Sequence, residues 1–88
     1  MKTAFRKSFA RDLKKIKSQV MRMHVRLAIE QVEAANDLQA IEDLKKLSGA
    51  DRCYRIRIGD YRIGLFLDGE TIEFVRCLPR RDLYRYFP

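Results

Sequence analysis

The stretch Tyr54–Arg62, which reads Tyr-Arg-Ile-Arg-Ile-Gly-Asp-Tyr-Arg, alternates bulky apolar residues with arginine. A period of two residues is typical of a β-strand with one buried and one open face. We therefore expect Tyr54, Ile56 and Ile58 to face a hydrophobic core. The arginines between them would stand together on the opposite face of the sheet.

The alternation breaks at Gly59 and Asp60 and then resumes. This pair predicts a tight hairpin turn, because glycine adopts positive φ without strain. Arg62 would then begin the next strand close to the cationic face that Arg55 and Arg57 form. The role of these arginines is the main functional question that the sequence raises.

Two further strands are predicted after this turn. Residues 61–67 alternate again, and Asp68-Gly69 is the strongest hairpin signal in the chain, a candidate two-residue type I′ turn. Residues 71–78 are apolar on both faces, so we expect a central strand there. Pro79 stops this strand, and residues 80–87 are expected to form one or two helical turns.

The first half of the chain predicts mainly helices. A short strand within residues 3–7 would precede a helix capped by Ser8, and Ser18 would cap a longer helix that ends near residue 36. Residues 38–48 read as a partly helical connector, with the remaining strands beginning after Asp51. The predicted order is β-α-α-β-β-β-(α). It describes a small α+β domain over residues 1–88, in which two N-terminal helices pack on a twisted antiparallel sheet.

Length and composition limit the classes of protein. The chain has 88 residues and is 47% hydrophobic, enough apolar material for one small core and too much for global disorder. No run approaches the roughly 18 to 20 apolar residues that a membrane-spanning helix needs, and the first residues do not resemble a signal peptide. We therefore expect a cytoplasmic protein without a membrane partner.

The chemistry-bearing residues predict no metal site and no cofactor. Cys53 and Cys77 lack the Cys-x-x-Cys spacing, and the single histidine, His24, does not complete a ligand set. We expect both cysteines to be thiols packed in or beside the sheet.

The net charge of +7 indicates a polyanionic or acidic partner. The eight basic residues of positions 52–88 are all arginine. Arginine presents planar, bidentate donors that suit phosphate, whereas lysine acts more as a point charge. This bias favours recognition of phosphate or of an acidic protein.

The C-terminal half resembles the RelE/ParE superfamily of toxins. Three segments carry the resemblance: the run that begins at Tyr54, the Asp-Gly hairpin, and Phe-Val-Arg-Cys-Leu-Pro-Arg-Arg-Asp-Leu-Tyr-Arg over residues 74–85. Residues 1–48 are similar in layout, with a Leu-Lys-Lys-Leu-x-Gly exit. Members on the RelE side are ribosome-dependent endoribonucleases that cleave mRNA in the A site and are restrained by an antitoxin. Members on the ParE side poison DNA gyrase.

The resemblance implies a set of site residues. Arg55 and Arg57 match the basic pair near the scissile phosphate, and the remaining positions follow from the later motifs. Arg62 matches an arginine that opens the next strand and contacts the phosphate, and Arg80 matches an arginine that follows the last strand. Arg81 is an adjacent candidate, and Tyr84 matches a C-terminal tyrosine. The resemblance thus implies Arg62, Arg80 and Tyr84 as catalytic residues, and Arg55, Arg57 and Arg81 as phosphate-binding residues.

Metal-independent cleavage of RNA requires attack of the 2′-OH on the adjacent phosphorus. The reaction needs a proton acceptor, donors that stabilise the phosphorane, and an acid for the 5′-oxygen. The best-known members carry lysines where this chain has Arg55 and Arg57. Arginine stays protonated in proteins, so these two residues are poor bases. Tyr84 would stack on a base, orient the nucleophile or take its proton.

Three functional interpretations follow. The first is an mRNA-cleaving toxin with a cognate antitoxin and ribosome-bound mRNA as partners. The alternatives are a ParE-like inhibitor of DNA gyrase and a non-toxic binding member of the same fold. A solvated sheet face would also be polar, but it is normally a mixture of residue types rather than repeated arginine.

Overall fold

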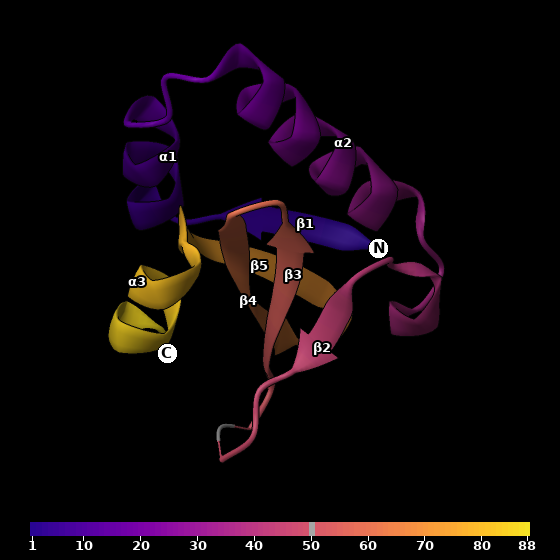
Figure 1. Cartoon of the computed structure of the whole chain (residues 1–88). Helices are drawn as coiled ribbons and strands as arrows, with labels where there is room; N and C mark the ends of the chain where they lie inside the picture. Colours follow the sequence, from indigo (N-terminus) through magenta and orange to yellow (C-terminus); the bar gives the residue numbers. More distant parts are fainter. Residues whose placement is uncertain (50) are drawn as a thin grey trace.

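The computed structural model describes residues 1–49 and 51–88. Within these ranges the chain forms three helices, five strands and one 3₁₀ turn (Figure 1). In chain order they are β1 (Lys2–Phe5), α1 (Lys7–Lys14), α2 (Gln19–Ala34), the 3₁₀ turn (Leu38–Ala40), β2 (Leu44–Lys46), β3 (Cys53–Ile58), β4 (Tyr61–Asp68), β5 (Thr71–Pro79) and α3 (Arg80–Tyr86). The predicted α+β class is confirmed. No helix in the described ranges is long and apolar enough to cross a membrane.

The five strands form one sheet in the order β1-β5-β4-β3-β2. All neighbours are antiparallel except β1 and β5, which are parallel. The predicted antiparallel sheet is therefore wrong at this edge, and the sheet is mixed. The reason is topological, because the chain crosses over through two helices between β1 and the hairpins, and such a crossover permits parallel pairing.

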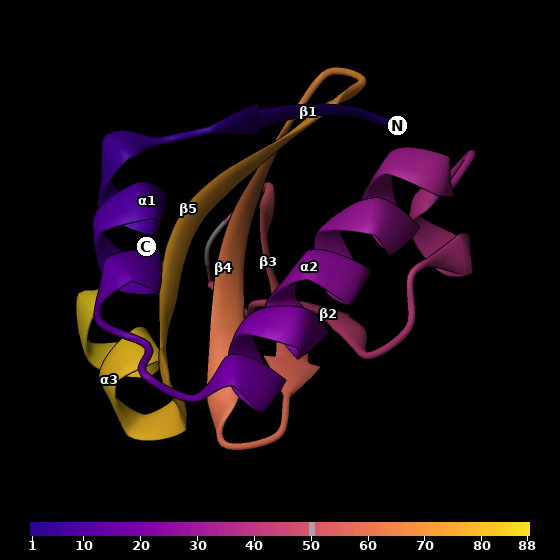
Figure 2. The ribbon, with the colours of Figure 1, turned by 90° about the horizontal axis from the view of Figure 1, so that it is seen from above.

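Helices α1 and α2 cover one face of the sheet, and α3 lies at the other (Figure 1). Seen from above, α1 runs beside β5 while α2 crosses the sheet obliquely and packs against β1 and β3 (Figure 2). The main core lies between these helices and the sheet. Its buried residues include Phe9, Val25, Val32, Ile56, Ile58, Ile63, Leu65, Ile72 and Phe74.

The alternation in the opening stretch is confirmed. Ile56 and Ile58 are buried in the main core, and Tyr54 is half-buried against it. The predicted turn connects β3 to β4, with Gly59 at a φ of 53°. The hairpin thus presents its arginines on the face away from α2.

The predicted helix starts differ in accuracy. Ser18 caps α2 by accepting a hydrogen bond of 3.1 Å from the backbone N–H of Met21. Ser8 lies inside α1 rather than before it, and its hydroxyl donates to the carbonyl of Val75 at 2.6 Å. The hydroxyl hydrogen-bonds to the backbone of β5 instead of capping the helix, because α1 packs directly against that strand.

A buried carboxylate joins α1 to β5. Asp12 is 5% exposed and accepts hydrogen bonds from Arg76 Nε at 2.7 Å and Nη2 at 3.2 Å. The same carboxylate accepts from the backbone N–H of Cys77 at 2.9 Å. The hydrogen bond to Asp12 raises the pKa of the Arg76 guanidinium, which therefore stays charged. Opposite charges and three donors compensate the burial of Asp12.

A second, smaller core seats α3 on the opposite face of the sheet. Leu83 and Phe87 are buried against Cys53 and Val75. Gly64 makes this packing possible, because a Cβ atom there would lie 2.8 Å from the ring of Phe87. The ring of Phe87 thus occupies the space that a side chain at Gly64 would take.

Gly64→Ala is expected to dislodge Phe87 and to lower the free energy of unfolding by roughly 1–3 kcal/mol, the usual cost of overpacking. Urea denaturation measures the loss, and Phe87→Ala provides the double-mutant cycle. Because Phe87→Ala removes the clashing ring, adding Gly64→Ala to it should cost much less than adding it to the wild type. Equal costs in both backgrounds would show that the contact does not explain the glycine.

Candidate phosphate-binding site

Cross-strand register brings the arginines of the hairpin together on the face opposite α2. Arg57 of β3 pairs directly with Arg62 of β4, and Arg55 pairs with Gly64. Directly paired residues project to the same face and lie about 5 Å apart at Cβ. The predicted cationic face is therefore built from two neighbouring rows of the sheet.

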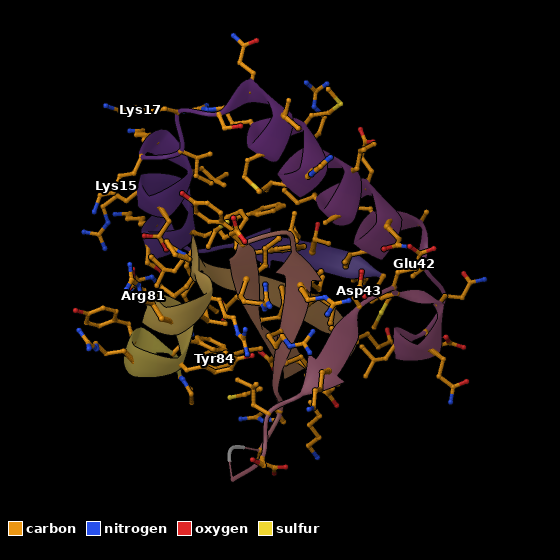
Figure 3. All side chains as sticks on the ribbon, viewed as in Figure 1. Lys15, Lys17, Glu42, Asp43, Arg81 and Tyr84 are labelled. Carbon is orange, nitrogen blue, oxygen red and sulfur yellow. The ribbon has the colours of Figure 1, made fainter. Side chains whose placement is uncertain are left out.

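Asp43, just before β2, holds the two arginines of β3. Its carbonyl accepts from Arg55 Nη1 at 2.7 Å and from the backbone N–H of Arg57 at 3.2 Å. Its carboxylate lies 3.6 Å from Arg57 Nη2. Asp43 has a φ of 59°, a conformation that aspartate tolerates better than most residues. Figure 3 shows it where β2 begins, beside β3.

Arg55 and Arg57 differ in exposure and in their hydrogen-bond partners. Arg55 is half-buried, and its Nε has no hydrogen-bond partner in the described part of the chain. Arg57 is exposed, and its ion pair with Asp43 joins two side chains that are 59% and 51% exposed. Such a pair contributes little, at most about 1 kcal/mol. An incoming phosphate can therefore replace the Asp43 carboxylate on Arg57.

Arg62 is more enclosed than an open sheet face predicts. It is 7% exposed, and its Nη1 donates to the carbonyls of Gly59 at 2.8 Å and Tyr61 at 2.9 Å. One guanidinium nitrogen is thus committed to the hairpin turn. The residue supports the turn, and its predicted contact with substrate stays a prediction.

The start of α3 is fixed to the same hairpin. The backbone N–H of Arg80 donates to the carbonyl of Asp60 at 2.9 Å. Arg80 and Tyr84 are one helical turn apart, so they project from the same side of α3. Both are exposed, and Tyr84 is 51% exposed.

The contacts of α3 tell which way that side faces. The guanidinium of Arg76 lies 6.0 Å from the ring centre of Tyr86, which places Tyr86 on the side of α3 toward β5 and α1. In a helix, Arg80 and Tyr84 lie on the other side of the buried stripe from Tyr86, toward β4. Figure 3 shows Arg81 and Tyr84 on different sides of α3. Helical spacing thus turns Arg80 and Tyr84 toward the hairpin, and Arg81 lies on a different side of α3 from Tyr84.

Sequence reasoning missed two neighbours of these arginines. No sequence motif indicates Asp43, because its contacts depend on a backbone conformation with positive φ. Lys45 lies on β2, which was predicted as part of a connector, and it pairs directly with Arg55. A strand of only Leu44–Lys46 is too short to show an alternating pattern.

The cysteines lie outside this chemistry. Both are free and buried, as predicted. Burial, with a smaller effect of Asp12, raises the pKa of the Cys77 thiol to about 12, and burial also raises the pKa of Cys53. Neither thiol is therefore an activated nucleophile. Within the described residues, no group of three or more His, Cys, Asp or Glu side chains is arranged to hold a metal ion.

The arrangement can bind and polarise a phosphodiester. Arg57 on β3 and Arg80 at the start of α3 are exposed arginines, while Arg55 and Arg62 are oriented by backbone carbonyls. Fixed cations of this kind stabilise negative charge that develops at phosphorus. Tyr84 adds an exposed aromatic ring, a surface on which a base can stack.

The chain resembles known proteins over nearly its whole length. Residues 4–84 match the family described as the ParE toxin of type II toxin-antitoxin system, parDE. Toxin RelE3 of Methanocaldococcus jannaschii is 43% identical over 89 residues, with 100% of both chains covered.

Solved structures share the fold. A chain of the RelB-RelE antitoxin-toxin complex from Methanococcus jannaschii is 41% identical, with a TM-score of 0.82 over 97% of this chain and 99% of that chain. The archaeal RelE-RelB complex from Pyrococcus horikoshii OT3 contains a chain 20% identical, with a TM-score of 0.72 over 90% of this chain and 93% of that chain. The second likeness concerns the fold alone.

Proposed function

Because this chain belongs to the ParE toxin family of type II toxin-antitoxin systems, we propose that it is an endoribonuclease that cleaves mRNA on the ribosome and so inhibits translation. The coarser assignment, a toxin of a RelBE-type system, follows from the full-length similarity to Toxin RelE3. The resemblance to the RelE/ParE superfamily is therefore confirmed. Cleavage on ribosomes would place its action in the cytoplasm.

The grouping of arginines around one hairpin supports this proposal best. Arg57 and Arg62 are cross-strand partners, and the backbone of Arg80 is bonded to the turn between them. A purely solvated face would not require guanidinium groups to be oriented by Asp43 and Gly59 carbonyls. Pre-oriented donors are the arrangement that phosphoryl chemistry uses.

The proposed reaction is attack of the 2′-oxygen on the adjacent phosphorus. Arg57 and Arg80 would bind the non-bridging oxygens and stabilise the phosphorane, and Arg55 would hold the phosphate from the neighbouring row. Tyr84 would stack on a base or orient the 2′-OH. Because the arginines are poor proton acceptors, alignment of the RNA by the ribosome would supply much of the rate.

A cognate antitoxin is the proposed protein partner. The structural relatives from Methanococcus jannaschii and Pyrococcus horikoshii were crystallised as complexes that contain RelB. An acidic segment of such an antitoxin would complement the arginine face and compete with RNA for it. Binding would then neutralise the toxin directly.

Inhibition of DNA gyrase is the second candidate function. The matching family is described as the ParE toxin family, and members on the ParE side of the superfamily poison gyrase. The two functions predict different molecular products. A gyrase inhibitor would block supercoiling without cutting RNA, whereas the proposed nuclease would leave gyrase unaffected.

Induced expression followed by mapping of mRNA 5′ ends tests the proposal. New 5′ ends should appear inside open reading frames within minutes, since cleavage on ribosomes follows translation. A supercoiling assay with purified gyrase serves as the counter-test. Inhibited supercoiling with intact mRNA would replace the nuclease by the gyrase function, and the absence of both effects would indicate a non-toxic binding member.

A further inference from the structure

We propose that Lys45 is a catalytic residue of this site, which donates a proton to the 5′-oxygen leaving group as the RNA chain is cut. The inference rests on the nuclease function proposed above and names a group that the motifs of the chain do not indicate. It answers the question of how a site built from arginines transfers a proton.

The position of Lys45 follows from the register of β2. Lys45 pairs with Arg55, which in turn pairs with Gly64 of β4. All three residues therefore share the face opposite α2. Phe87 of the C-terminal segment covers Gly64 at one end of this row, whereas Lys45 at the other end is exposed to solvent. Lys45 therefore lies beside Arg55 on the edge strand of this face, one row away from Arg57.

Lys45 is also available for contact with substrate. Its side chain is exposed, and it makes no ion pair within the described ranges 1–49 and 51–88. Arg55, the cross-strand partner of Lys45, is held in place by a hydrogen bond of 2.7 Å from its Nη1 to the Asp43 carbonyl. The neighbouring Lys46 provides a natural comparison, because it pairs with Tyr54 and projects to the other face, 3.9 Å from Asp51.

The chemical reason is the difference between the two kinds of cation. A guanidinium group is not deprotonated in proteins, so no arginine of the site can deliver a proton. A lysine ammonium group can donate one and be recharged from solvent. Lysine also occurs on exposed edge strands to discourage association of sheets, but Lys46 would serve that purpose equally. Lys45 differs from Lys46 in lying on the face of the sheet that carries Arg55.

The proposed step conserves atoms and charge. The 2′-oxygen forms a bond to phosphorus, and its proton passes to a water molecule. The bond between phosphorus and the 5′-oxygen breaks, and the 5′-oxygen takes a proton from Lys45 Nζ. The products are a 2′,3′-cyclic phosphate and a 5′-hydroxyl, and Lys45 regains its proton from solvent. Arg55 and Arg57 keep their charge throughout.

The test compares two leaving groups in single-turnover cleavage of mRNA on programmed ribosomes. One mRNA has the natural 5′-oxygen at the scissile position, and the other has a 5′-bridging sulfur, whose thiolate leaves without a proton. Lys45→Ala and Lys45→Arg are each expected to cut the natural mRNA about 10²-fold more slowly than wild type, the usual contribution of general acid catalysis. Both variants should cut the sulfur-containing mRNA at nearly the wild-type rate.

Lys46→Ala is the matched control and should cut both mRNAs as wild type does. Thermal unfolding of all variants confirms that the exposed β2 substitutions leave the fold intact. A wild-type rate for Lys45→Arg on the natural mRNA would overturn the proposal, because arginine keeps the charge but donates no proton. An equal defect of Lys45→Ala on both mRNAs would overturn it as well. Failure of the wild type to cut either mRNA would instead refute the nuclease function, and the role of Lys45 with it.

Discussion

Replacing Arg57 and Arg80 together by alanine is expected to lower the rate of mRNA cleavage by about 10³-fold or more, since loss of one donor to a developing oxyanion costs about 10²–10³. Both side chains are exposed, and neither is buried in a core. The substitutions therefore remove charge from the site with little effect on folding. Cleavage is measured in single turnover with ribosomes programmed with a defined mRNA, and stability by urea denaturation.

Arg81→Ala is the matched control for this experiment. Arg81 follows Arg80 directly on α3, carries the same charge and is also exposed. Figure 3 places it on a different side of α3 from Tyr84, so its loss should change the rate only slightly. If Arg81→Ala slows cleavage as much as Arg80→Ala alone, which removes the same single charge, net positive charge rather than the hairpin geometry governs the reaction.

Replacing Asp12 by alanine is expected to destabilise the protein by about 3 kcal/mol or more, because it leaves Arg76 without its partner beside the core. The carboxylate accepts from Arg76 Nε at 2.7 Å and from the backbone N–H of Cys77 at 2.9 Å. Its loss also removes one of the contacts between α1 and β5, while the hydrogen bond from Ser8 to Val75 remains. The free energy of unfolding in urea measures the effect.

Asp51→Ala provides the comparison for an exposed carboxylate. The side chain of Asp51 is 92% exposed and lies 3.9 Å from Lys46 Nζ. Its removal should change the stability by less than about 0.5 kcal/mol. A similar small value for Asp12→Ala would mean that the pair with Arg76 does not join the helix to the sheet.

The core-forming strands were the most predictable part of the fold. The alternation around Ile56 and Ile58 and the turn at Gly59 encode one hairpin, and α2 begins at the predicted Ser18 cap. The pairing of β1 with β5 and the existence of β2 were not predictable in this way. Both depend on contacts between segments far apart in the sequence, and both strands are too short to show a period.

The candidate site shows the same division. Arg55 and Arg57 could be identified because their spacing determines the face that they share. The enclosure of Arg62 could not, because it follows from hydrogen bonds to the turn carbonyls of Gly59 and Tyr61. The contribution of Asp43 depends on its positive φ and on the position of β2. Motifs indicated the kind of site, and tertiary packing decided which residues are free to act.

The most direct test of the central claim uses the purified protein with ribosomes programmed with mRNA, in the absence of added metal beyond that which the ribosome requires. We predict a single cut in the mRNA that yields a 2′,3′-cyclic phosphate and a 5′-hydroxyl, with the rate greatly reduced in Arg57→Ala/Arg80→Ala. Intact mRNA after prolonged incubation with the wild-type protein, under conditions in which the same preparation inhibits gyrase, would contradict the account.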